Sequence, residues 1–144
     1  MKKPDSFNLE RFVDAQTGNY AVALQELREG EKRSHWMWYI FPQVAGLGNS
    51  PMAKTYAIQS RAEAVAYLAH PILGDRLREC VAAVNRVQGS PATEIFGGID
   101  AMKFRSSLTL FAQVADDRSL FEEALDKYYD GEMDRLTLSL LDNG

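Results

Sequence analysis

Apolar side chains recur every three or four residues along most of this sequence, and that spacing limits the fold more than any other feature. The clearest run begins at Ser60 and, after Pro71, continues from Leu73 to Gly89 at helical periodicity. No window shows the strand and turn alternation of a sandwich, nor the strand and helix alternation of a parallel sheet. The sequence therefore predicts a mainly α fold, built as a compact multi-helical bundle.

Capping signals indicate where several helices begin and end. Ser60, followed three residues later by Glu63, fits a capping box, so we expect a helix to start there. Pro71 should break or kink that helix, because proline lacks the backbone N–H that a helix interior needs. Farther along, Ser119 is expected to cap another helix, and a last short helix is expected after Asp134.

One long segment, between Ile40 and Pro51, has no helical pattern. Its letters FPQVAGLGNSP contain two prolines and two glycines, which are the strongest signals for turns and loops. Long ordered loops are uncommon inside small domains, and they often carry function. We therefore expect one long irregular loop in the bundle.

Length and charge limit the class of protein. The 144 residues fit a single domain spanning 1–144, and the net charge of -4, from 16 basic and 20 acidic residues, argues against nucleic acid as a partner. No apolar run approaches the length of a membrane span, and the first residues lack the apolar region of a secretory signal. The expectation is a soluble cytoplasmic protein.

The stretch KRSHWMWYIFPQ, from Lys32 to Gln43, gathers most of the unusual side chains. In an extended chain Trp36 and Trp38 would share one face, whereas in a helix they would spread apart. So much aromatic surface favours a core segment. The neighbouring Arg33 and His35, however, suit a flat heterocycle with an attached phosphate, through stacking and charge-assisted hydrogen bonds. Both interpretations stay open.

A second polar cluster lies in DAMKFRSSLTLF, from Asp100 to Phe111. Lys103, Arg105 and Ser106 fall within four residues, and Lys103 and Ser106 would share a helix face. Near a helix start they would present an ammonium and a hydroxyl group to an anion. Basic and hydroxyl side chains are also common on ordinary helix surfaces, and the glycine pair upstream lacks the spacing of a P-loop.

Metal binding and nucleophilic catalysis receive little support. The two histidines, His35 and His70, are far apart, and no histidine or cysteine pair has ligand spacing, so we predict no metal. Cys80, the single cysteine, falls in an apolar helical stripe and is expected to be buried and unreactive. The sequence assigns no reaction or cofactor, so whether the protein is an enzyme stays open.

The motifs HWMW-x-x-FPQ, LG-x-SP and K-x-RSS-x-TLF resemble those of a bacterial family catalogued as domain of unknown function 1810, sometimes mislabelled calpastatin. The resemblance covers nearly the whole chain, from about Phe7 to Leu141. It implies a compact, mainly helical single domain. It implies no activity, so no residue role is carried over from it.

Two functions follow from these patterns. The first is the binding of an anionic or nucleotide-like small molecule in an aromatic and basic cleft, if folding brings the two polar clusters together. The alternative is a protein-interaction module without catalysis, with the loop from Val44 to Pro51 and nearby aromatic residues as its docking patch. The candidate ligand-binding residues are Arg33, His35, Trp36, Trp38, Lys103, Arg105 and Ser106.

Overall fold

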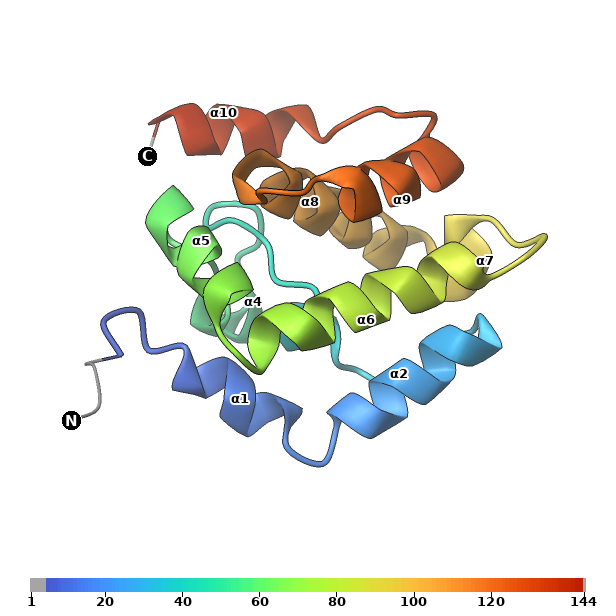
Figure 1. Cartoon of the computed structure of the whole chain (residues 1–144), viewed down its shortest axis with the longest axis horizontal. Helices are drawn as coiled ribbons and strands as arrows, with labels where there is room; N and C mark the ends of the chain where they lie inside the picture. Colours follow the sequence, from blue (N-terminus) through green and yellow to red (C-terminus); the bar gives the residue numbers. More distant parts are fainter. Residues whose placement is uncertain (1–4, 144) are drawn as a thin grey trace.

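A computed structural model describes residues 5–143, which form ten helices and no strand (Figure 1). The mainly α, multi-helical prediction is confirmed. Within the same residues, no helix is long and apolar enough to cross a membrane. The helices are α1 (Glu10–Gln16), α2 (Tyr20–Glu29), α3 (Met37–Ile40), α4 (Pro51–Thr55), α5 (Arg61–Ala69), α6 (Leu73–Arg86), α7 (Ala92–Phe96), α8 (Gly98–Val114), α9 (Ser119–Tyr129) and α10 (Arg135–Asn143).

The longest helix, α8, is the centre of the bundle and packs against α5, α7, α9 and α10. In Figure 1, α9 and α10 lie at the top, α1 and α2 at the bottom, and α5 and α6 between them. Phe104, Leu108 and Phe111 of α8 are all buried. A helix covered on most sides needs apolar residues around its circumference, which explains why this stretch shows mixed periodicity in the sequence.

The predicted helix boundaries before and after Pro71 are confirmed. The Ser60 side chain accepts a hydrogen bond from the Glu63 N–H at 3.1 Å and so caps α5. That helix ends at Ala69, before Pro71, and α6 begins at Leu73. His70 lies between them, and its Nδ1 accepts a hydrogen bond from the Leu73 N–H at 3.2 Å. One of the two histidines is therefore part of a helix junction.

The two later boundaries are reproduced with one difference. Asp134 precedes α10, and its carboxylate accepts a hydrogen bond from the Thr137 N–H at 3.2 Å, as expected of a helix cap. Ser119 is the first residue of α9 and not its cap, since its own N–H donates to the Asp117 carboxylate at 3.0 Å. The capping carboxylate stands two residues earlier in the sequence than the serine we expected to cap.

The long loop runs from the end of α3 to the start of α4, as predicted, and it is held at several points. An isolated parallel bridge pairs Val44 with Ile58, and the Ile58 N–H donates to the Gln43 carbonyl at 2.9 Å. Gly46 has a φ of 102° and passes against α10, where an added Cβ would lie 3.2 Å from Leu140. These contacts hold the loop against the segment after α4 and against α10.

Candidate functional site

The two tryptophans have different surroundings, because the segment that carries them forms the short helix α3 and is not extended. Trp36 is 1% exposed and belongs to the aromatic core, with Phe41 beside it. Trp38 is half-buried and lines a cavity. The core interpretation of this stretch holds for Trp36, whereas a place for Trp38 in a ligand site stays a prediction.

A buried carboxylate in α2 fixes the chain just before α3. Glu26 accepts hydrogen bonds from the backbone N–H groups of Arg33 (2.8 Å) and Ser34 (3.0 Å), from the Ser34 hydroxyl (2.6 Å), and from the Trp36 indole N–H (3.0 Å). Burial would raise its pKa, but these hydrogen bonds to the ionised form lower the pKa to about 2. Sequence analysis missed Glu26, because it stands within an ordinary helical pattern.

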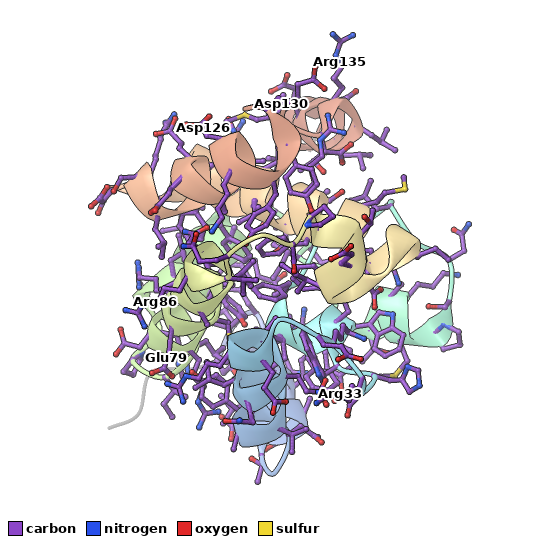
Figure 2. The ribbon with its side chains drawn as sticks, turned by 90° about the vertical axis from the view of Figure 1, so that its right-hand side faces the viewer. Arg33, Glu79, Arg86, Asp126, Asp130 and Arg135 are labelled. Carbon is purple, nitrogen blue, oxygen red and sulfur yellow. The ribbon has the colours of Figure 1, made fainter. Side chains whose placement is uncertain are left out.

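The basic residues before the aromatic run do not line the cavities beside Trp38. Arg33 lies on the side of the molecule shown in Figure 2, where its guanidinium contacts Glu29 at 2.7 Å and Glu31 at 3.6 Å. His35 is exposed, and its carbonyl accepts a hydrogen bond from the Tyr39 hydroxyl at 3.4 Å. Their place in a ligand site stays a prediction.

The two polar clusters, in the stretches 32–43 and 100–111, do come into contact, but not through Arg33 or His35. The Nζ of Lys32 lies 2.9 Å from one carboxylate oxygen of Asp100, and the Nζ of Lys103 lies 3.7 Å from the other. The Lys103 Nζ also lies 5.4 Å from the centroid of the Trp38 ring, in a cation–π arrangement. Trp38 and Lys103, predicted from separate motifs, therefore meet on one surface.

Arg105 has a structural role in this arrangement. Its guanidinium donates to the backbone carbonyl groups of Glu132 and Met133, both at 2.9 Å. These carbonyl groups belong to the linker between α9 and α10, so the side chain holds that linker against α8. The charge of Arg105 is thus directed at the backbone of its own chain.

The hydroxyl groups of the RSS-x-T motif also connect α8 to α10. Ser106 donates to the Asp134 carboxylate at 2.9 Å, and the Thr109 hydroxyl accepts a hydrogen bond from the Asp134 N–H at 2.9 Å. Ser107 is 2% exposed and lies in the core. Of these hydroxyl groups, that of Ser106 lines the cavity described next.

Two adjoining cavities lie along the long loop, one between the loop, the first half of α8 and the start of α10, and the other between the loop, Trp38 and α4. The larger has a volume of about 440 Å³, within the usual range for small-molecule sites, and the smaller about 100 Å³. Trp38 and Tyr56 line the smaller cavity. Gln43 and three small or apolar residues line both. We refer to the two cavities together as the cleft.

One face of α8 forms a wall of the larger cavity. Ile99, Met102, Lys103 and Ser106 all line it, and their spacing of three, four and seven residues places them on the same side of the helix. This stripe is visible in the sequence. Sequence analysis did not separate it from the buried stripe of the same helix, because both contain apolar residues.

The charged groups of the cleft are few. Lys103 is the one lysine or arginine among the described residues that line the larger cavity, and Asp134 is the one carboxylate. Lys54 lines the smaller cavity. The uncharged polar residues of the larger cavity are Gln43, Asn49, Ser50 and Ser106, and the two amides can each both donate and accept hydrogen bonds.

Metal ligands and the single thiol were the other candidates for chemistry in the part of the chain that the structure describes. Over residues 5–143, no group of three or more histidine, cysteine, aspartate or glutamate side chains could hold a metal ion. Cys80 is a free, buried thiol, and burial raises its pKa to about 12. The thiol therefore stays protonated at neutral pH, as the sequence predicts for an unreactive cysteine.

Comparison with known proteins places the chain in a family. A family model described as "Protein of unknown function (DUF1810)" matches residues 6–141. The chain belongs to this family. The crystal structure of the conserved hypothetical protein Rv1873 from Mycobacterium tuberculosis is similar, with a TM-score of 0.94 and 52% sequence identity, and the match covers 96% of this chain and 99% of that one. No curated protein matches.

Proposed function

We propose that this DUF1810 protein binds a small anionic, nucleotide-like molecule in the cleft, with the anionic group at Lys103. The observation that carries the proposal is the position of that ammonium group at the cavity without a hydrogen bond to the described residues. Its contacts are an ion pair with Asp100 at 3.7 Å and the cation–π contact with Trp38. The N–H donors of Lys103 can therefore serve a ligand.

The neighbouring Lys32 differs from Lys103, because its ammonium group is hydrogen-bonded within the chain. Its Nζ donates to the Ser34 carbonyl at 2.6 Å, contacts Asp100 at 2.9 Å, and lies 4.9 Å from the Trp36 ring centroid. Only 7% of this side chain is exposed. Asp100 is shared between the two lysines, and its shorter contact is with Lys32, so Lys103 is the less tightly held of the two ammonium groups.

The uncharged groups of the cleft suit the rest of such a ligand. The amides of Gln43 and Asn49 offer donors and acceptors to a polar heterocycle or to hydroxyl groups. Trp38 and Tyr56 line the smaller cavity, so an aromatic surface lies beside the amides. Of the residues predicted from the sequence, the proposal rests on Trp38, Lys103 and Ser106.

Thermal melting with a panel of nucleotides and sugar phosphates tests this function. A ligand present at about 100 times its dissociation constant adds about 2.7 kcal/mol, which raises the Tm of a domain of this size by several degrees. Lys103→Gln should remove the rise. Arg86→Gln, a loss of charge at a residue that does not line the cleft, should keep it. A panel that leaves the native Tm unchanged throughout would overturn the proposal.

A protein-interaction module is the second candidate, favoured by exposed apolar side chains beside the loop. Met52 of α4 is 38% exposed, and larger exposures occur across the cleft on α8 and α10. Exposed apolar patches mark protein interfaces as well as ligand sites. This function predicts a chain that self-associates or requires a partner, which sedimentation velocity measures directly.

A further inference from the structure

The most exposed large apolar side chains in residues 5–143 gather at the cleft. Ile99 is 74% exposed, Met102 72% and Leu136 54%, and all three line the larger cavity. We call them the apolar rim. Other exposed apolar residues, such as Val65 at 49% and Ile72 at 40%, line neither cavity of the cleft. The clustering of these three exposed apolar side chains at one cavity requires an explanation.

The fold does not need these apolar residues. Ala101 and Phe104 of α8 face the core and are buried, whereas Ile99 and Met102 lie on the opposite side of the same helix. The exposed side of a helix in a water-soluble bundle is normally polar. Single exposed apolar residues need no special reason, but three around one cavity form a patch, and such patches mark binding surfaces.

Polar side chains also line this cavity, and two of them, Lys103 and Asp134, are charged. The Ser106 hydroxyl donates a hydrogen bond to the Asp134 carboxylate at 2.9 Å. The same carboxylate oxygen also accepts a hydrogen bond from the N–H of Thr137. The Lys103 ammonium group forms no hydrogen bond with the described residues, and its ion-pair partner Asp100 is 3.7 Å away. The cavity therefore combines this ammonium group with exposed apolar side chains.

We propose that the ligand of the cleft is amphipathic, with its anionic group at Lys103 and an aryl or acyl part lying against Ile99, Met102 and Leu136. This narrows the proposed function and rests on it. A cavity of about 440 Å³ accommodates a molecule of that kind. The unbranched, polarisable side chain of Met102 can adapt to an apolar group of varied shape.

The same geometry disfavours a protein surface as the occupant. A second copy of the chain, or another protein, could cover the rim. It would then cover the cavity of about 440 Å³ without filling it, and would withdraw from water the Lys103 ammonium group, whose ion-pair partner Asp100 is 3.7 Å away. Withdrawing a charged group from water without a hydrogen-bond partner is unfavourable. A small amphipathic anion could fill the larger cavity and cover the apolar rim at the same time.

Fluorescence titration with anilinonaphthalene sulfonate, an anionic aryl probe, tests the inference on the full chain. We expect saturable binding of one probe per chain. Met102→Gln and Leu136→Gln should each raise the dissociation constant about tenfold, since each removes the burial of one large apolar side chain. Lys103→Gln should raise it to a similar extent. Val65→Gln and Ile72→Gln, the controls at exposed apolar residues that do not line the cleft, should leave it unchanged.

The outcomes separate the two proposals. If nucleotides or the probe bind and depend on Lys103, but Met102→Gln and Leu136→Gln bind as the native chain does, the amphipathic inference is overturned and the proposed function stands. If neither the probe nor any nucleotide binds, both are overturned. Equal losses in the Val65→Gln control, or a native dimer that Met102→Gln dissociates, would also overturn the inference. Melting curves of each variant check that the exposed substitutions leave the fold intact.

Discussion

Replacing Glu26 by glutamine should destabilise the protein, and the effect should depend on pH. The carboxylate is 5% exposed and accepts four hydrogen bonds from the segment 33–36. Lowering its pKa from 4.5 to about 2 corresponds to about 3 kcal/mol of stabilisation at neutral pH. Glutamine has one acceptor oxygen where the carboxylate has two, and its NH₂ group would face other donors. We expect Glu26→Gln to lose about 2–3 kcal/mol at pH 7.

The direction of the pH dependence follows from the lowered pKa. A carboxylate with a depressed pKa in the folded state stabilises the protein fully above its unfolded pKa of 4.5, and the contribution disappears as the pH falls toward about 2. The native chain should therefore lose stability between pH 4.5 and 2. The difference between the native chain and Glu26→Gln should shrink over the same interval.

Urea unfolding followed by circular dichroism, repeated from pH 7 to pH 2.5, measures this directly. Glu29→Gln is the matched control on the same helix, because the Glu29 side chain is exposed and its main partner is the surface residue Arg33. This control should change stability little at any pH. A Glu26→Gln variant as stable as the native chain at pH 7, or a deficit that persists unchanged at pH 2.5, would refute the reasoning.

Three further effects are expected. Asp134→Ala should lower the free energy of unfolding by about 1–3 kcal/mol, because it removes the acceptor of several donors at the junction of α8 and α10. Urea unfolding measures this loss, and an unchanged free energy would contradict the role of Asp134 at the junction. Gly46→Ala should lower the Tm more than Gly18→Ala, since both glycines have positive φ but an added Cβ contacts Leu140 only at Gly46; equal losses would contradict this. Cys80 should react with a thiol reagent at neutral pH only upon unfolding, and rapid reaction of the native chain would show that the thiol is accessible.

Features of the fold that depend on local signals could be predicted from the sequence. The cap at Ser60, the break at Pro71 and the long loop before Pro51 each follow from the chemistry of one or two residues. The path of the aromatic stretch could not be predicted in this way. It depends on Glu26, whose contacts with residues 33–36 form only when α2 and the following turn are in place.

The candidate site could be predicted only in part, because it depends on contacts between distant segments. Trp38 and Lys103 are 65 positions apart, and only packing shows that they meet. Arg105 belongs to a donor-rich motif that resembles an anion site, yet its donors serve backbone carbonyl groups of the same chain. The apolar residues Ile99 and Met102 have helical spacing, but spacing alone does not distinguish an exposed face from a buried one.

The most direct test of the cleft uses the indole N–H signals of the two tryptophans in a ¹H–¹⁵N correlation spectrum. The Trp36 indole is buried and bonded to Glu26, whereas Trp38 lines the cleft beside Lys103. Saturation with anilinonaphthalene sulfonate, or with any nucleotide that raises the Tm, should shift the Trp38 signal and leave the Trp36 signal in place. Binding that leaves Trp38 unmoved, or that shifts Trp36 alone, would show that the ligand site lies elsewhere.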